Sequence, residues 1–216
     1  ETDRGQQMCA AAARLSTTQG SSVEIFERAE GDERNLPLVR KVLASGHKSL
    51  IEHQTYSVAF ENVSVLAEQF MIEFRLASFI VKSRRYVDFK NAGFYTPAAL
   101  EGDAAYRAHM ARLFADYEKL EALVPREDAR FVLPQAAETM VVVTMNCRAL
   151  LHFFNLRCCR RAQWEIRALA EAMLDLCKAE LPAIFGVAGA KCESLGYCPE
   201  SERFACGRYP TRKVQG

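Results

Sequence analysis

The run TMVVVTM at residues 139–145 constrains the fold more than any other segment. β-Branched side chains lose χ1 freedom in a helix and pack well on a pleated sheet, so the run favours an extended backbone. A strand this apolar needs cover from other elements. The sequence therefore predicts a buried strand against which strands and helices pack.

Further elements follow from the spacing of apolar residues. Tyr56, Val58 and Phe60 alternate along 55–60, which predicts a second strand, and 84–89 also has β-type residues. Helices are predicted over 9–16, 35–46, 64–74, 103–123, 146–156 and 162–181. The elements are mixed without a βαβ repeat, which favours an α+β fold with a mixed or antiparallel central sheet flanked by long helices.

Several residues predict where these helices begin and end. Gly46 suits a left-handed helix end, and Ser49 is a candidate N-cap for a short helical turn. Pro125 can begin a short helix at its first turn, and Asn146 is a candidate N-cap. The last long helix is expected to end before Pro182.

Length and charge exclude several classes of protein. The 216 residues contain no linker-like stretch, so we expect one domain over 1–216 with a Cys-containing tail at 190–216. A net charge of +1 argues against nucleic acid as a partner, so any anion site must be local. No apolar run has bilayer length and no signal-peptide pattern is present, so we expect a cytoplasmic protein without membrane contact.

Three arginine-containing segments are candidates for an anion site. The segment EFRLASFIVKSRRY (73–86) is interpreted as a helix end followed by a loop. A nucleotide phosphate is held by Arg or Lys side chains and Ser hydroxyls. A lone arginine is more often a solvated or salt-bridged surface residue, yet the three segments could converge on one anion. Their polar residues are Ser83, Arg84 and Arg85, then Arg130, then Arg157, Arg160 and Arg161.

Four motifs in order resemble the flavin-dependent thymidylate synthase family over roughly residues 11–185. The family's Arg-His-Arg-x-x-Ser-x-x-x-x-Ser-x-Arg-Tyr is matched by Arg75, Ser78, Ser83, Arg85 and Tyr86. GHKSLIEH, ARFVLP and NCRALLHFFNLRCCRRAQWEIR resemble the other three. Four motifs together are far more specific than any one of them.

The resemblance implies a reaction and its cofactors. Such enzymes use FAD to carry a one-carbon unit from methylenetetrahydrofolate to C5 of dUMP, and NADPH reduces the flavin. No protein nucleophile is required. The protein positions the reactants and stabilises charge on the uracil ring, because C5 becomes nucleophilic only as charge builds on O2, O4 and N3.

The resemblance also implies roles for individual residues. Arg157 would stabilise the uracil charge and, with Ser83, make up the catalytic pair. The pyrimidine nucleotide would be bound by Gln69, Ser83, Arg84, Arg85, Arg130 and Arg157. The flavin would be bound by Ser16, His47, Ser49, Glu52, Arg75, Leu76, Asn146, Arg148 and His152. Family members build each site from several subunits, so the resemblance implies a homotetramer in which Arg85 and Arg157 come from different chains.

The sequence departs from the family pattern at four places in the first motif. Glu73 and Phe74 replace an Arg and a His, and Ile80 and Val81 replace the usual Asn-Glu. A carboxylate about 4 Å from an anion repels it by roughly 4 kcal/mol at an effective dielectric near 20, so Glu73 cannot do the work of an arginine in the same pose. Farther on, His152 stands in place of an Asn.

Three interpretations therefore stay open. The chain is an active methylase of dUMP, or it methylates UMP or a related uridylate of modified-nucleoside biosynthesis, or it is a non-catalytic nucleotide-binding subunit. The tail has Cys192, Cys198 and Cys206, which would need one further ligand to bind zinc. Because Cys-x-x-Cys spacing is absent, no metal site is predicted.

Overall fold

The computed structural model describes residues 2–212, which divide into two compact units. The terminal unit contains the described residues up to Tyr56 together with those from Thr144 onward, and the central unit is Ser57–Val143. Both boundaries fall inside strands. That the chain acts as one domain over 1–216 stays a prediction.

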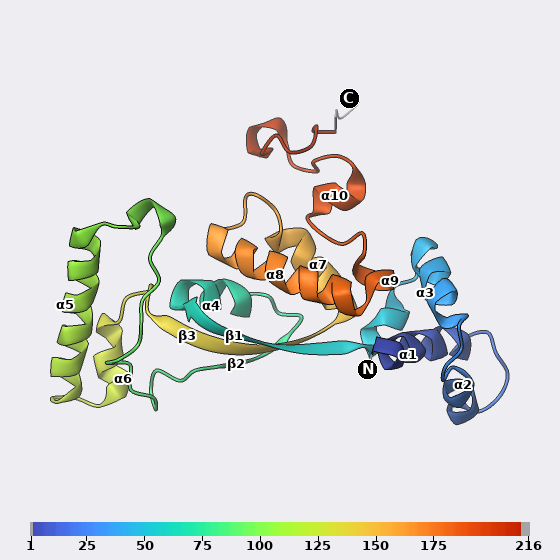
Figure 1. The fold of residues 1–216 in the computed structure, drawn as a ribbon, viewed down its shortest axis with the longest axis horizontal. Helices are drawn as coiled ribbons and strands as arrows, with labels where there is room; N and C mark the ends of the chain where they lie inside the picture. Colours follow the sequence, from blue (N-terminus) through green and yellow to red (C-terminus); the bar gives the residue numbers. More distant parts are fainter. Residues whose placement is uncertain (1, 213–216) are drawn as a thin grey trace. The chain divides into compact units, whose positions relative to one another are not determined.

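The sheet has three strands, β1 (Thr55–Ser64), β2 (Ser78–Val81) and β3 (Glu138–Asn146) (Figure 1). It is antiparallel, and its order β1-β3-β2 places β3 at the centre. The predicted α+β class is confirmed, and so are the predicted strands at 55–60 and 139–145. Phe60 is buried and Tyr56 and Val58 are half-buried, whereas the residues between them are exposed, as the alternation predicted.

Strand β3 is buried on one face only. Val141 and Val143 are each 1% exposed, but Met140 and Val142 are 45% and 44% exposed. The prediction of a buried strand therefore holds for alternate residues, because successive side chains of a strand point to opposite faces.

The third strand lies outside the segment where the sequence predicted it. Residues 78–81 form β2 instead of a loop, and the Lys82 N–H donates to the Met140 carbonyl at 3.0 Å, which continues the pairing with β3. The predicted strand over 84–89 is wrong, because the chain turns there and the Val87 N–H donates to the Ser83 carbonyl at 3.0 Å. The β-propensity of Phe79, Ile80 and Val81 was the correct signal.

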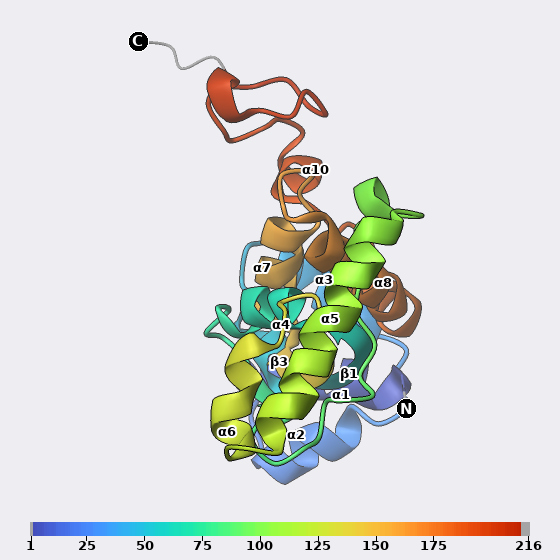
Figure 2. The same ribbon diagram turned by 90° about the vertical axis from the view of Figure 1, so that its left-hand side faces the viewer.

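The central unit also contains three helices, α4 (Val65–Ile72), α5 (Ala104–Glu121) and α6 (Arg126–Ala129). Ser64 caps α4 by accepting the Ala67 N–H at 3.0 Å, and Asp103 caps α5. Pro125 occupies the N-cap position of α6, one residue earlier than predicted. Helices α5 and α6 lie side by side in both views (Figures 1 and 2).

Two apolar clusters hold these elements together. Tyr117 of α5 is fully buried against Phe89 and Ala129, and Phe114 packs with Val65 and Ala137. The long helix predicted over 103–123 is thus confirmed with its buried face.

The terminal unit is largely helical. The helices predicted over 9–16, 35–46, 146–156 and 162–181 are confirmed. The sequence analysis did not predict the second helix of the chain, α2 (Ser22–Arg28). Its signal was a capping box, in which Ser21 accepts the Glu24 N–H at 3.2 Å and the Glu24 carboxylate accepts the Ser21 N–H at 3.0 Å. The helices are α1 (Thr2–Leu15), α2 (Ser22–Arg28), α3 (Asn35–Ala44), α7 (Cys147–Arg157), α8 (Trp164–Glu180), α9 (Pro182–Phe185) and α10 (Lys191–Leu195).

The helix ends in this unit match the predictions except at Ser49. Gly46 has a φ of 88° just after α3, and α8 ends before Pro182, as expected. Ser49 is not a cap: it is the first residue of a 3-10 helix, η1 (Ser49–His53), and Lys48 holds the cap position without a side-chain hydrogen bond. Among residues 2–212, no helix has both the length and the apolar character needed to cross a membrane.

A buried ion pair crosses the central unit. Arg84 donates to both carboxylate oxygens of Glu68 at 2.9 and 3.1 Å, and Glu68 is 1% exposed. The Thr139 hydroxyl donates to the same carboxylate at 3.0 Å. The turn after β2 is therefore tied both to α4 and to β3, and the buried Glu68 carboxylate has hydrogen-bond partners on two sides.

We expect Glu68→Gln to lower the free energy of unfolding by about 3 kcal/mol, since it leaves the Arg84 guanidinium without its carboxylate. Urea unfolding followed by circular dichroism would measure the loss. The control is Glu127→Gln, which removes an exposed ion pair in the same unit, Arg85 Nε to Glu127 Oε2 at 2.7 Å, and should cost less than about 1 kcal/mol. Equal losses in the two variants would contradict the role given to the Glu68 pair.

Candidate functional site

Two of the arginines predicted to bind nucleotide meet at one residue of the central unit. Arg85 is 2.7 Å from the Glu127 carboxylate, and Arg130 Nε donates to the Glu127 backbone carbonyl at 3.0 Å. The side chains of Arg85 and Glu127 are 54% and 44% exposed, so a ligand can reach them. Arg85 thus contacts the side chain, and Arg130 the backbone carbonyl, of the same residue.

Ser83 fixes the backbone next to this pair. Its hydroxyl accepts the Arg85 N–H at 3.3 Å, and its carbonyl closes the turn to Val87. The Arg85 guanidinium also lies 5.4 Å from the centroid of the Tyr86 ring. The SRRY segment is therefore a defined turn that presents Arg85 outward.

Arg84 lies in the same turn but its side chain has a different environment. Its guanidinium is held by buried Glu68, as described above, so it supports the turn from inside the unit. Its assignment to nucleotide binding stays a prediction.

Arg126 was missed by the sequence analysis although it lies beside the predicted arginines. It donates to the Tyr86 carbonyl at 3.2 Å and pairs with Glu121 at the end of α5. Hydrogen bonding to Glu121 raises the pKa of Arg126, so its charge is fixed. It links the turn containing Tyr86 to α6, and its position four residues before Arg130 was the available signal.

The remaining predicted residues of the central unit are exposed around the end of α4. Gln69 is on α4, and Arg75 and Leu76 lie between α4 and β2, with Leu76 63% exposed. Of the residues that depart from the family motif, Glu73 is the exposed C-cap of α4 and Phe74 is only 6% exposed. Phe74 is thus part of the hydrophobic core.

In the terminal unit, predicted flavin residues come together from two segments. Arg148, in the first turn of α7, forms an ion pair with Glu52 of η1. Asn146 caps α7 by accepting the Ala149 N–H at 2.9 Å, as predicted. His47 lies just before η1, Ser49 is the first residue of η1, and His152 is exposed one turn after Arg148 on α7.

Two other predicted residues lie at helix ends. Ser16 follows α1, where its hydroxyl donates to the Ala13 carbonyl at 3.1 Å. Arg157 is the last residue of α7 and lines a cavity of about 380 Å³ within the terminal unit. Arg161 lines the same cavity.

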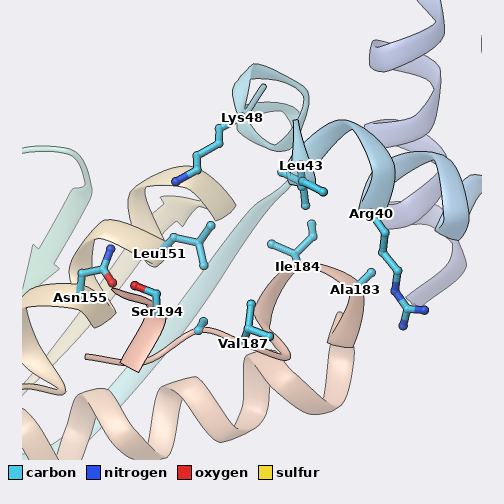
Figure 3. Close-up of a pocket in the computed structure, with 11 residues that line it drawn as sticks. Arg40, Leu43, Lys48, Leu151, Asn155, Ala183, Ile184, Val187 and Ser194 are labelled. Carbon is cyan, nitrogen blue, oxygen red and sulfur yellow. The ribbon is translucent and has the colours of Figure 1, made fainter. Parts of the chain in front are cut away.

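A second cavity of about 320 Å³ in the terminal unit was not predicted. Its walls include Leu43, Leu151, Ile184 and Val187, and the Lys48 side chain points toward Leu151 (Figure 3). Sequence reasoning missed these residues because apolar side chains at helical spacing are usually core. The cavity adjoins the segment of His47 and Ser49 through Lys48 alone among its lining residues.

Three of the buried thiols, Cys9, Cys147 and Cys158, do not offer a ready nucleophile. Burial raises the pKa of Cys9 to about 11 and that of Cys158 to about 12, and it also raises the pKa of Cys147 at the start of α7. These groups remain protonated thiols at neutral pH. This agrees with chemistry in which the protein supplies positioning and charge.

Comparisons with known proteins identify the family of the chain. The family model described as "Thymidylate synthase complementing protein" matches residues 1–183. The chain is 48% identical over 194 residues to the flavin-dependent thymidylate synthase of Nitratidesulfovibrio vulgaris, covering 84% of this chain and 79% of the relative. The enzyme of the same name from Geobacter sulfurreducens is 41% identical over 92% and 88% of the two chains.

A more distant relative gives the same result. The flavin-dependent thymidylate synthase of Pyrococcus abyssi is 38% identical, covering 88% of this chain and 83% of the relative. The residues matched by the family model, 1–183, include all four motifs. The chain therefore belongs to the flavin-dependent thymidylate synthase family and is an enzyme of this kind.

Proposed function

We propose that the chain methylates C5 of dUMP to give dTMP, with FAD as its flavin, methylenetetrahydrofolate as the carbon donor and NADPH as the reductant. The observation that carries this proposal is the meeting of Arg85 and Arg130 at Glu127. Family membership supports the flavin and the uridylate, and the two arginines support an anionic substrate.

The Arg85–Arg130 pair suits a phosphate. Phosphate oxygens take the hydrogen bonds that the Glu127 carboxylate and carbonyl now accept, and a dianion gains more from two guanidinium groups than a single carboxylate does. The Ser83 hydroxyl, next to Arg85, adds a donor. Glu127 thus occupies the place of the phosphate until the nucleotide binds.

The residues near Arg148 fit an anionic flavin in part. Arg148 is half exposed, and its partner Glu52 can release it to a flavin phosphate. The exposed Arg75 offers a second cation, whereas buried Phe74 offers no polar contact. When bound, the flavin supplies hydride and one-carbon transfer. We place Ser16, His47, Ser49, Glu52, Arg75, Leu76, Asn146, Arg148 and His152 around it.

Arg157 would act on the base. A guanidinium donates hydrogen bonds to the uracil edge where negative charge builds as C5 attacks, and this stabilisation is stronger in the transition state than in the ground state. Arg157 is half-buried and lines its cavity at the end of α7, so it sits in a medium that screens its charge less than water does.

The first test compares dUMP and UMP, both deuterated at C5, as substrates of the purified chain supplied with FAD, methylenetetrahydrofolate and NADPH. We expect deuterium release from dUMP and a much slower release from UMP. Release from UMP alone would assign the chain to uridylates of modified-nucleoside biosynthesis. No release from either nucleotide would overturn the proposed catalysis and leave a nucleotide-binding subunit, which dUMP binding by calorimetry would then test.

The second prediction concerns the phosphate site. Arg85→Ala should weaken dUMP binding about 30-fold, because a hydrogen-bonded charge pair contributes about 2 kcal/mol. Glu127→Gln removes the competing carboxylate and should leave binding equal or tighter. Isothermal titration with dUMP measures both, and deoxyuridine, which lacks the phosphate, should bind the wild-type chain and Arg85→Ala equally. Weaker binding by Glu127→Gln would show that Glu127 does not stand in for the phosphate.

We also propose a homotetramer with sites shared between chains, in which Arg85 and Arg157 of one site come from different subunits. Exposed apolar side chains support association: Ile80 of β2 and Leu76 are 76% and 63% exposed, and Met140 on the neighbouring strand β3 is 45% exposed.

Mixing tests the shared site. Arg85→Ala and Arg157→Ala chains, denatured and refolded together in equal amounts, should recover about a quarter of the wild-type activity, since one quarter of the sites then contain both arginines. The assay uses a dUMP concentration at which each variant alone is nearly inactive. Light scattering gives the number of chains. If the mixture refolds to tetramers but recovers no activity, both arginines of a site must come from one chain.

A further inference from the structure

Four cysteines line one cavity of the terminal unit. Three come from the tail, and the fourth is Cys159, which follows α7 directly. The cavity has a volume of about 380 Å³, and its thiols are Cys159, Cys192, Cys198 and Cys206. All four are free thiols. The three cysteines of the tail would need a fourth ligand to bind a metal ion. Cys159 is the candidate, because the fold places it in the lining of the same cavity.

Specific contacts hold the tail in place over this cavity. The Cys198 N–H donates to the Pro210 carbonyl at 2.8 Å, which folds the segment between them into a closed loop. Arg161 reaches this loop, since its guanidinium lies 4.9 Å from the centroid of the Phe204 ring and 3.8 Å from the Glu200 carboxylate. Cys206 lies within the loop. These contacts connect the tail to the segment after α7, and Cys192, Cys198 and Cys206 line the same cavity as Cys159.

The charge of the cavity complements a metal thiolate centre. Its charged lining residues are Arg157, Arg161, Lys191 and Glu200, which is three cations and one anion. Four thiolates around a divalent ion carry a net charge of −2, which these side chains balance. Four free thiols would gain nothing from three cations, whereas a dianionic centre is stabilised by them.

We propose that Cys159, Cys192, Cys198 and Cys206 bind one zinc ion as a tetrathiolate. Four sulfur ligands around a tetrahedral ion leave no open coordination position, so the site is structural. Among residues 2–212, no three Cys, His, Asp or Glu side chains are grouped closely enough to hold a metal ion. The proposed binding thus requires the four thiols to move together, with exposed Cys206 turning inward. Each thiol gives up its proton to solvent as it binds.

The ion would fix the segment next to Arg157. Cys159 is two residues beyond this arginine, and both line the same cavity. The zinc site does not depend on the proposed reaction, because its occupancy is measured without flavin or nucleotide.

The experiment is metal analysis of the full chain, purified without chelator and with any affinity tag removed. We expect one equivalent of zinc per chain by mass spectrometry. Cys206→Ser should bind zinc at least tenfold more weakly in competition with a chromogenic chelator. This variant tests binding without a folding defect, because Cys206 is exposed, and circular dichroism checks its fold.

Cys158→Ala is the matched control for Cys159→Ser. The two residues are neighbours, but Cys158 does not line the cavity, so its variant should keep a full equivalent of zinc while Cys159→Ser loses it. Alkylation gives an independent readout: four thiols should react only after zinc is removed. Absence of stoichiometric zinc after dialysis against zinc, iron with acid-labile sulfide in its place, or undiminished zinc binding by both Cys159→Ser and Cys206→Ser would overturn the proposal.

Discussion

The ion pair between Arg84 and Glu68 fixes the geometry of the turn at residues 83–86. Glu68 has almost no contact with solvent, and its carboxylate receives hydrogen bonds from Arg84 and Thr139. One charged group thus connects α4, the central strand and the turn after β2. Such a pair adds little net stability compared with apolar residues, yet removing one partner is costly, so it specifies one conformation.

This constraint gives the adjacent residues Arg84 and Arg85 different environments. Because Arg84 is held inside, Arg85 points to the surface, where it pairs with the carboxylate of Glu127, and the backbone carbonyl of Glu127 accepts a hydrogen bond from Arg130. The sequence RR alone does not distinguish the two, since both match a basic motif. The distinction comes from a buried acid 16 residues earlier in the chain.

Sequence reasoning succeeded where the signal was local. The caps at Asn146 and Gly46 and the buried face of α5 depend on nearby residues, and the structure confirms them. It failed for β2, because four residues become a strand only through pairing with β3, which is 60 residues away. For the site, motif positions predict Arg85 and Arg130 as nucleotide-binding residues, and this stays a prediction, whereas the ion pair of Arg85 with Glu127 depends on tertiary geometry that no motif contains.

Glu127 has a consequence for selectivity among anions. In the proposed site, an incoming ligand must displace a tethered carboxylate, which is present at a high effective concentration. Chloride or a singly charged metabolite interacts with the arginines no more strongly than the Glu127 carboxylate already does. The tethered carboxylate therefore outcompetes it. A phosphate dianion gains enough binding free energy from the arginines to displace the Glu127 carboxylate. A tethered carboxylate of this kind sets the minimum affinity that a ligand needs in order to bind. It keeps weaker anions in the cell from occupying a solvent-exposed cationic site.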